Sequence, residues 1–313
     1  MDYLSKIILI YGPTASGKSN LAVKLAKKID GEIINADSMQ VYRQLKILTA
    51  RPNKKDETII KHHLYGIIDV NKSFSVGNWL KLVNQKIKEI RKKNKTPILV
   101  GGTGLYFQSL INGLVKIPKI PLKIRKKVRL IQKKEGQKKF YKRVLKLDNK
   151  IKGKFDPNDV QRSIRAFEIK YQTKISMYDW LKKTKSMYNE NEFLKIYLDF
   201  NRPKLIKRIS LRTSKMLQIG VIKEVKRFIT YKIKKDSSVN KVIGINELKQ
   251  YLKNQMTLEE VEALISIRTR QYAKRQATWA RSRMTSWNKI SQDEIFSLIK
   301  KINKSTLKLD QLI

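Results

Sequence analysis

The chain has 313 residues, of which 41% are hydrophobic, so it can bury one large core or two smaller ones and is not expected to be disordered. It has no cysteine and only His62 and His63 as imidazoles, which excludes disulfides, thiolate zinc sites and a cysteine nucleophile. No apolar run approaches the ~20 residues that cross a bilayer, and the chain enters a strand without a cleavable signal pattern. We therefore expect a cytosolic (cytoplasmic) protein with no membrane partner.

The formal net charge is +44, from 70 basic and 26 acidic side chains. Such an excess favours a polyanionic partner, above all nucleic acid, because each phosphate that is neutralised releases condensed counterions. Lysine, isoleucine and asparagine are abundant together, as an A+T-rich coding bias would produce. The charge thus indicates either a nucleic-acid surface or solvated lysines that have no specific partner.

The first motif along the chain is a loop that is built to hold phosphates. An apolar run of strand length, Lys6 to Tyr11, leads into "GPTASGKS", and Leu21 to Ile29 then repeat apolar residues at helical spacing. In such a loop, backbone N–H groups and the start of the helix surround phosphate oxygens. The residues predicted to bind a diphosphate here are Gly12, Pro13, Thr14, Ala15, Ser16, Gly17, Lys18 and Ser19.

Two side chains in this loop have a predicted chemical role of their own. Lys18 adds a mobile cation, and the hydroxyl of Ser19 is the expected protein ligand of Mg²⁺. The same pattern is typical of nucleotide-binding and ATP-binding proteins, so the loop predicts phosphate binding and leaves the reaction open.

Two later strands also end in polar or glycine residues. Asp37 follows the apolar run Glu32 to Ala36, and Thr103 follows Pro97 to Val100 after two glycines. Functional groups of open α/β sheets gather at the carboxyl ends of the strands, where the phosphate loop also lies. Asp37 is therefore interpreted either as a catalytic group or as the N-cap of a following helix. The segment "ILVGGT" carries no acidic residue, which argues against phosphoryl transfer.

The order of the elements predicts the fold class. A further strand is expected at Lys195 to Phe200, and helices such as Val76 to Lys93 separate the strands, which favours a mostly parallel sheet. Strand signals vanish between Ile117 and Glu192, where basic helical periodicity follows two prolines. We predict an α/β protein with a P-loop NTPase-like core in residues 1–116 and 195–313, which includes the C-terminal helices, and an inserted helical subdomain in residues 117–194.

Seven segments together resemble the tRNA dimethylallyltransferase family, also called tRNA isopentenyltransferases. They are "GPTASGKS", "DSMQVYR", "TARP", "HHLYGIIDV", "GGTGLY", "DPNDVQRSIRAFEI" and "YAKRQATWAR", and the resemblance runs from about Ile7 to Arg281. It implies transfer of a dimethylallyl group from dimethylallyl diphosphate to N6 of the adenosine just 3′ of the anticodon. The implied partners are that diphosphate and the anticodon stem-loop of tRNA, with Mg²⁺ as cofactor. We expect the chain to act as a monomer.

The resemblance also implies roles for particular residues. Asp37 is the base that accepts the N6 proton, and Thr103 lies near the bridging oxygen of the diphosphate. Lys18 and Arg212 stabilise the leaving group, with Arg208 one helical turn before Arg212. The implied tRNA contacts are Asp37, Ser38, Met39, Gln40, Thr103, Arg125, Gln161, Arg162, Ser163, Ile164 and Arg165.

Several alternatives remain open at this point. The stretch "RTRQYAKRQATWARS" is either a helix that faces nucleic acid or a core helix with Tyr272 and Trp279 turned inward. Leu48 stands where the family usually has a glycine, which leaves local tRNA contacts open. A small-molecule kinase would share the phosphate loop, and a noncatalytic RNA-binding module would need the charge but not Asp37 or Thr103.

Overall fold

The computed structural model describes residues 6–291 and residue 294. The chain divides into two compact units, unit 1 with residues 1–109 and 188–313 and unit 2 with residues 110–187. The division falls at 110 and 188, whereas the sequence predicted 117 and 195. Parts of the predicted core, namely residues 1–5, 292–293 and 295–313, lie outside the described residues.

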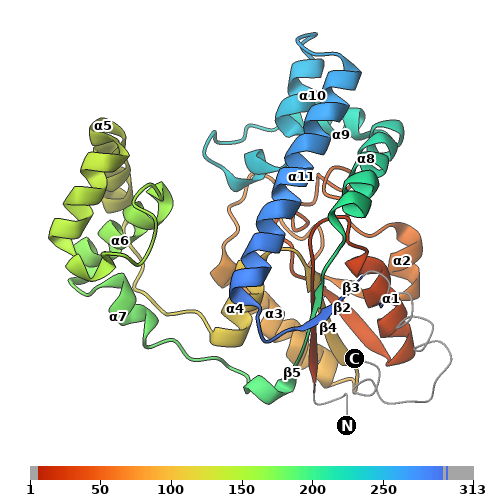
Figure 1. Cartoon of the computed structure of the whole chain (residues 1–313), viewed down its shortest axis with the longest axis horizontal. Helices are drawn as coiled ribbons and strands as arrows, with labels where there is room; N and C mark the ends of the chain where they lie inside the picture. The colour runs from red at the N-terminus through yellow and green to blue at the C-terminus, as the bar shows by residue number, and fades with distance from the viewer. Residues whose placement is uncertain (1–5, 292–293, 295–313) are drawn as a thin grey trace. The chain divides into compact units, whose positions relative to one another are not determined.

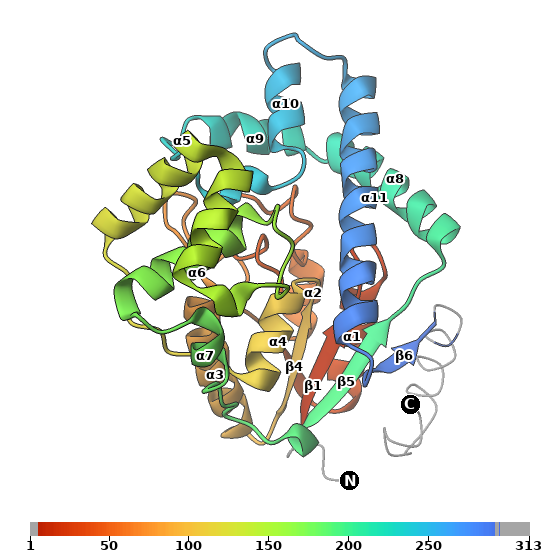
Figure 2. The same ribbon diagram turned by 60° about the vertical axis from the view of Figure 1, so that its left-hand side comes forward.

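Unit 1 is built on a six-stranded sheet in the order β3-β2-β4-β1-β5-β6, and every pairing is parallel (Figures 1 and 2). The strands are β1 (Ile7–Tyr11), β2 (Gly31–Asn35), β3 (His62–His63), β4 (Thr96–Gly101), β5 (Phe193–Leu198) and β6 (Asn288–Ile290). The predicted parallel sheet is confirmed, and each of the four predicted strands is found within two residues of its expected ends. Sequence patterns missed β3 and β6, because strands this short show too little alternation.

The central strands are buried on both faces, so they read as continuous apolar runs. Ile8 and Ile10 of β1 pack with Leu21 and Leu25 of the first helix in one cluster. Tyr11 instead packs its ring against four others from distant segments, Phe107, Tyr197, Trp279 and Trp287. Segments that are far apart in the sequence are thereby fixed around β1.

The helices of unit 1 begin with α1 (Lys18–Lys28), which starts three residues before the predicted Leu21, and α3 (Val76–Arg91), which is close to its predicted range. The others are α2 (Lys54–Ile59), α4 (Gly104–Asn112, which runs into unit 2), α8 (Arg202–Gln218), α9 (Val221–Ile229), α10 (Ile245–Tyr251) and α11 (Leu258–Arg283). Short 3-10 helices lie at Glu190–Glu192 and Ser238–Lys241. Among the described residues, no helix combines the length and apolar character that a membrane span requires.

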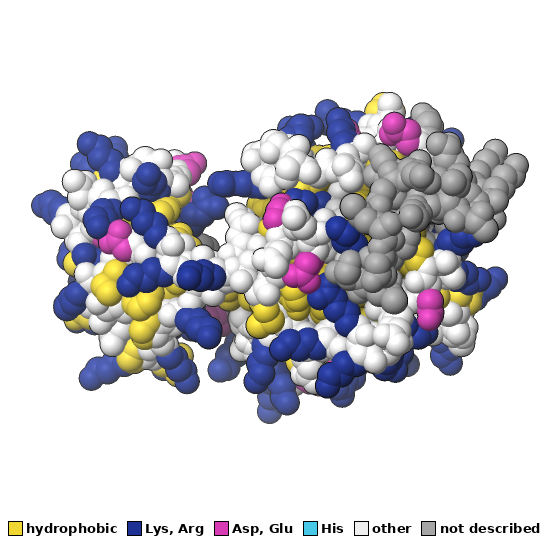
Figure 3. Space-filling view, turned by 90° about the horizontal axis from the view of Figure 1, so that it is seen from below, with side chains coloured by type: hydrophobic (Ala, Val, Ile, Leu, Met, Phe, Trp, Pro, Cys, Tyr) yellow, Lys and Arg dark blue, Asp and Glu magenta, His cyan; other side chains and the backbone are white. Residues whose placement is uncertain are grey.

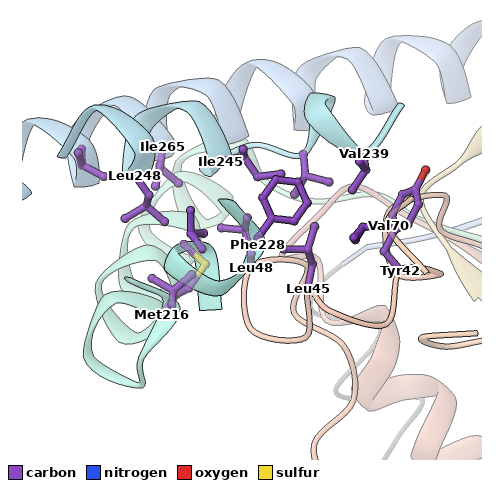
Figure 4. Close-up of a cluster of buried hydrophobic side chains, with 14 of the residues drawn as sticks. Tyr42, Leu45, Leu48, Val70, Met216, Phe228, Val239, Ile245, Leu248 and Ile265 are labelled. Atoms are coloured by element: carbon purple, nitrogen blue, oxygen red, sulfur yellow. The ribbon is translucent and has the colours of Figure 1, made fainter. Parts of the chain in front are cut away.

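A second apolar cluster lies under α9, α10 and α11 (Figure 4). Phe228, Ile245 and Ile265 of these helices pack there against Tyr42 and Leu48, which come from the long connection after β2. That connection has no regular secondary structure between Ala36 and the start of α2. Its shape therefore depends on this cluster, and the cluster fixes the residues that follow Asp37.

Unit 2 is a helical insertion with its own core of Val128, Phe140, Val144, Ile151 and Phe167. Its elements are α5 (Leu122–Leu147), a 3-10 turn (Asn149–Ile151), α6 (Val160–Thr173) and α7 (Met177–Leu181). The α5 helix is interrupted at Gly136, whose φ of 73° and ψ of 164° are not helical. The structure contains no strand between residues 117 and 192, as the sequence predicted.

The segments that enter and leave unit 2 run side by side. The Ser186 hydroxyl donates to the Leu110 carbonyl at 3.2 Å. Gly113 has a φ of 84°, and a Cβ on it would lie 2.1 Å from the Lys185 carbonyl oxygen. Only glycine permits both this backbone conformation and this close approach.

The ends of β2 and β4 approach one another more closely than side chains would allow. A Cβ on Gly101 would lie 2.1 Å from the carbonyl oxygen of Ala36 and 2.8 Å from its Cα, so it would meet backbone that cannot rotate away. Gly101 is not among the residues with positive φ, so space and not backbone strain requires the glycine.

We expect Gly101→Ala to destabilise unit 1 by about 2–3 kcal/mol, because an overpacked site must displace backbone. Gly220→Ala is the control, since Gly220 has a φ of 102° but nothing within 4 Å of an added Cβ. It should cost only the ~1–2 kcal/mol of a left-handed residue. Urea unfolding of both variants measures the difference, and equal costs would contradict the collision at Ala36.

Candidate active site

The phosphate loop connects β1 to α1 as predicted, and Gly17 occupies the N-cap of the helix with a φ of 91°. Two of its backbone N–H groups already have protein partners. The Thr14 N–H donates to Oε1 of Gln276 at 2.8 Å, and the Ser16 N–H donates to the Pro13 carbonyl at 3.2 Å. The predicted phosphate contacts of these two residues therefore cannot come from backbone N–H groups in this arrangement.

Three cationic side chains surround the loop, and all three were predicted. Lys18 Nζ donates to the Pro13 carbonyl at 3.2 Å, and Arg212 donates from Nη1 to the Thr14 hydroxyl at 2.8 Å. Arg208 reaches Gly17, where a Cβ would lie 3.3 Å from its Nη2. The α8 helix thus brings two arginines to the loop, one turn apart.

Burial changes the acid–base properties of these cations. The pKa of Lys18 is lowered to about 8, mainly by burial; the charge of Asp37 acts to raise it and the positive charge of Arg212 acts to lower it. Burial also lowers the pKa of Arg212, against the attraction of Asp37. Two cations that repel each other in a buried site are stabilised by an anion placed between them, so the loop is electrostatically suited to a diphosphate.

Asp37 lies in a turn, and not at a helix N-terminus. Its Oδ1 accepts from the Met39 N–H at 2.9 Å, and the first helix after it is α2 at Lys54. Asn35 fixes the start of the turn, because its Oδ1 accepts from the Asp37 N–H at 2.8 Å and its Nδ2 donates to the Asp37 carbonyl at 3.0 Å. The interpretation of Asp37 as a helix N-cap was therefore wrong, and its carboxylate is held at the end of β2.

Thr103 joins the ends of β4 and β2. Its Oγ1 accepts from the Ser38 N–H at 2.9 Å and donates to the Ser38 hydroxyl at 3.3 Å. Its own N–H donates to the Ala36 carbonyl at 3.2 Å. The structure thus places Thr103 beside the turn that carries Asp37, as expected for groups at neighbouring strand ends.

Two cavities of unit 1 share Thr14, Asp37, Thr49 and Arg212 in their walls. One, of about 570 Å³, has the more polar wall and is lined by the phosphate loop, Gln40 and Arg208. The other, of about 310 Å³, has a largely apolar wall formed by Met39, Leu48, Met216, Val242, Ile243 and Ile265. Together they can hold a molecule that has an anionic end and an apolar end, with the Asp37 carboxylate where the two meet.

The wall of the apolar cavity is held in place by groups that sequence reasoning missed. The Glu224 carboxylate of α9 accepts from the N–H groups of Ile47 and Leu48, each at 2.8 Å. Gln40, which the sequence did predict as a site residue, donates from Nε2 to the carbonyls of Thr49 and Ala50, each at 2.9 Å. Leu48 is buried, and its Cδ1 would lie 2.5 Å from a Cβ on Gly244.

The residues present fit a magnesium ion that takes most of its ligands from a bound diphosphate. The exposed Ser19 lines the polar cavity together with Asp37 and Asp56. Among the described residues, no group of three or more His, Asp or Glu side chains forms a metal site of its own. Magnesium commonly binds through one or two protein oxygens together with phosphate oxygens and water, which agrees with this donor set.

The remaining predicted residues lie in unit 2, on or beside α6. Gln161 and Arg162 are exposed, whereas Ser163 and Ile164 are buried in the core of the unit. The side chains of Ser163 and Ile164 are therefore not presented to a partner. Glu168, only 2% exposed, lies 3.7 Å from Arg125 and 3.3 Å from Arg165, so one buried carboxylate orients both arginines.

The α11 helix confirms part of the interpretation that "RTRQYAKRQATWARS" is a core helix with its aromatic rings turned inward. The ring of Trp279 packs on that of Tyr11 at 5.9 Å, and Tyr272 lines the apolar cavity with Arg275 over its ring. Gln276 is 4% exposed and was missed as a site residue. The signal was present, because Thr269, Ala273, Gln276 and Ala280 fall on one helical face that is otherwise small or apolar.

Comparison with known proteins identifies relatives of this chain. The profile of the IPP transferase family matches residues 40–283, a range that begins after the phosphate loop. The tRNA dimethylallyltransferase of Pelagibacter ubique is 70% identical over 312 residues and covers 100% of both chains. That of Rickettsia massiliae is 42% identical over 280 residues, which are 89% of this chain and 77% of the relative.

Solved structures agree. The full-length tRNA isopentenylpyrophosphate transferase of Bacillus halodurans is 32% identical, with a TM-score of 0.68, and the match covers 98% of both chains. A eukaryotic dimethylallyltransferase that acts on tRNA is 30% identical, with a TM-score of 0.80 over 92% of this chain and 74% of the other. Because the family profile spans more than half of the 313 residues and these relatives match nearly the whole chain, the protein belongs to the IPP transferase family.

Proposed function

We propose that this chain transfers a dimethylallyl group from dimethylallyl diphosphate to N6 of the adenosine just 3′ of the anticodon in tRNA. The observation that carries the proposal is the position of Asp37, in the wall shared by a basic phosphate cavity and an apolar cavity. A diphosphate with a five-carbon chain fits that division, and a carboxylate lies where the two parts meet. The relatives described above are named for the same reaction.

The leaving group is stabilised by the phosphate loop and the cations around it. As the allylic C–O bond breaks, negative charge grows on the diphosphate oxygens. Lys18, Arg208 and Arg212 are positioned at the loop before the substrate binds. Preorganised cations stabilise developing charge without rearranging during the reaction, so they lower the barrier to departure.

The nucleophile is the exocyclic N6 amine of adenine, which is weak because its lone pair is delocalised into the ring. As N6 forms a bond to the first carbon of the allyl group, it gains positive charge and must lose one proton. Asp37 accepts that proton, and diphosphate leaves with the electron pair of the C–O bond. Thr103, whose Oγ1 accepts a hydrogen bond from the Ser38 N–H, is proposed to contact the bridging oxygen from the neighbouring strand end.

A magnesium ion is proposed to bind through the Ser19 hydroxyl together with diphosphate oxygens. When bound, it would supply additional positive charge to the leaving group.

The tRNA contacts are proposed from both units, each by its own residues. In unit 1, Asp37, Ser38, Met39 and Gln40 form the turn beside the cavities, and in unit 2 Gln161, Arg162, Arg165 and Arg125 supply polar and cationic groups. The adenosine leaves its stack to reach the site, which costs ~a few kcal/mol and less in a loop than in a duplex. We further propose that the chain works as a monomer in the cytoplasm, where its tRNA substrate is found.

The test of the function is incubation with tRNA, dimethylallyl diphosphate and Mg²⁺, followed by mass spectrometry of the tRNA nucleosides. We expect dimethylallyladenosine and one released diphosphate for each group transferred. Replacing dimethylallyl diphosphate with ATP separates this activity from that of a kinase. Transfer of the γ-phosphoryl group of ATP without any nucleoside product would contradict the proposal.

We predict that Asp37→Asn lowers turnover by ~10²-fold or more and leaves tRNA affinity nearly unchanged, because it removes the base and preserves its size. Single-turnover kinetics and a tRNA binding assay measure the two quantities. Asp30→Asn is the control, since Asp30 lies just before β2 at its other end and pairs with Lys95 at the surface. Turnover of Asp37→Asn close to that of Asp30→Asn would exclude Asp37 as the base.

The lowered pKa of Lys18 gives a second prediction. Below about pH 8 the side chain is cationic in the free protein, and above it the neutral form must take up a proton before it can pair with an anion. Affinity for inorganic diphosphate should fall as the pH rises above 8, by up to about tenfold per unit. Lys18→Arg keeps its positive charge in this pH range, so its affinity curve shows how much of the change comes from titration of the diphosphate itself. Parallel calorimetric curves for the two proteins would refute the role of Lys18.

The third prediction separates specific tRNA contacts from diffuse charge. Lys and Arg side chains are scattered over the face shown in Figure 3. The lysines at the end of α3 should contribute only to a diffuse field. Lys93 is left out of the control variant because it lies 3.6 Å from Glu32. We expect Arg162→Gln/Arg165→Gln to reduce the slope of log affinity against log salt by about one per lost contact.

The matched control is Lys88→Gln/Lys92→Gln, which removes one exposed charge from the last turn of α3 and one from its C-cap. It should give a small offset and a nearly unchanged slope in the same salt series. Equal losses in both double variants would mean that a diffuse field holds the tRNA. Circular dichroism of the arginine variant checks that unit 2 remains folded, because Glu168 loses one of its two partners.

A further inference from the structure

The buried side chain of Gln276 connects two catalytic loops through one planar amide. Its Oε1 accepts from the Thr14 N–H of the phosphate loop at 2.8 Å, and its Nε2 donates to the Gly102 carbonyl after β4, also at 2.8 Å. Its own backbone carbonyl accepts from the Tyr11 hydroxyl of β1 at 2.9 Å. Three contacts therefore tie this one position of α11 to the ends of two neighbouring strands.

The two backbone partners fix which way the amide points. An N–H can only donate and a carbonyl can only accept, so the oxygen must face Thr14 and the nitrogen must face Gly102. The fit is close, because a Cβ on Gly102 would lie 2.0 Å from Nε2 of Gln276. A side chain at this place must offer one donor and one acceptor at the reach of glutamine.

Both side-chain contacts of Gln276 lead to residues of the site. The Thr14 hydroxyl accepts a hydrogen bond from Arg212, so Gln276 holds the residue that orients a cation proposed to stabilise the leaving group. Gly102 precedes Thr103, whose Oγ1 receives the Ser38 N–H next to Asp37. The amide thus links the group that holds the diphosphate to the turn that holds the base.

We propose that Gln276 is a positioning residue that sets the spacing between the phosphate loop and the turn of Asp37 and Thr103. The proposal rests on the proposed function of the site. Gln276 contacts loop backbone and acts through Thr14 and Gly102. Displacement of reacting groups by about 1 Å can cost ~10²-fold in rate, so a small shift in this spacing is sufficient to slow transfer.

The test compares two replacements of the same length. Gln276→Met removes both hydrogen bonds. Gln276→Glu keeps an acceptor for Thr14 when ionised but cannot then donate to the Gly102 carbonyl. When protonated, the acid offers one acceptor and one donor, as the amide does. The ratio of its kcat to that of the wild type should therefore rise as the pH falls.

We expect Gln276→Met to lower kcat by about 10- to 100-fold at every pH, with tRNA affinity within about twofold of the wild type. For Gln276→Glu we expect a deficit of similar size at high pH that closes at low pH. Gln218→Met is the control, because Gln218 is exposed at the end of α8 and should keep wild-type kcat. Thermal unfolding sets a temperature at which every variant is folded.

The outcomes distinguish this proposal from the proposed function. A kcat of folded Gln276→Met within twofold of the wild type, or a pH-independent ratio for Gln276→Glu, overturns the role of Gln276. A wild-type protein that forms no dimethylallyladenosine overturns the proposed function instead. In that case, calorimetric binding of inorganic diphosphate decides the role of Gln276. Weaker binding by Gln276→Met, with a pH-dependent recovery in Gln276→Glu, supports it, and unchanged binding overturns it.

Discussion

The site depends on how closely three strand ends can approach. β1, β2 and β4 are neighbours in one parallel sheet, and their carboxyl ends carry the phosphate loop, Asp37 and Thr103. No Cβ fits between Gly101 and the Ala36 backbone, and none fits between Gly102 and Gln276. The two glycines therefore allow the backbone of three loops to meet, and the functional groups are positioned by that contact and not by long side chains.

The charges in this arrangement determine which ligands the site favours. Lys18 and Arg212 are half-buried, and the resulting loss of solvation destabilises both as cations; Asp37 only partly compensates. A site with two partly uncompensated cations binds a polyanion more readily than a neutral molecule, because the bound anion offsets the repulsion between the cations. An apolar cavity adjoins these cations and shares the Asp37 carboxylate with the cavity at the phosphate loop. In the proposed function, the cations hold the diphosphate and the apolar cavity holds its five-carbon chain.

Local pattern predicted most of the core. The phosphate loop, the four longer strands and the helical insertion each follow from residues adjacent in the sequence. The groups that hold the site together do not. Gln276 and Thr14 are 262 residues apart, and Glu224 and Ile47 are 177 apart, so no spacing rule connects them. Ser163 and Ile164 are buried although the resemblance implied tRNA contacts for them, because a family motif marks a whole segment and packing decides which of its side chains reach the surface.

The paired segments at Leu110 and Ser186 have a consequence for how such a protein evolves. Because the chain enters and leaves unit 2 at one place, that unit is an insertion with adjoining ends. Insertions of this kind can lengthen, shorten or be replaced while the host fold keeps its connectivity. The residue at position 113 is constrained to glycine, because its contact with the Lys185 backbone leaves no room for a side chain. Unit 2 can therefore diverge among relatives while the fold of unit 1 stays constant.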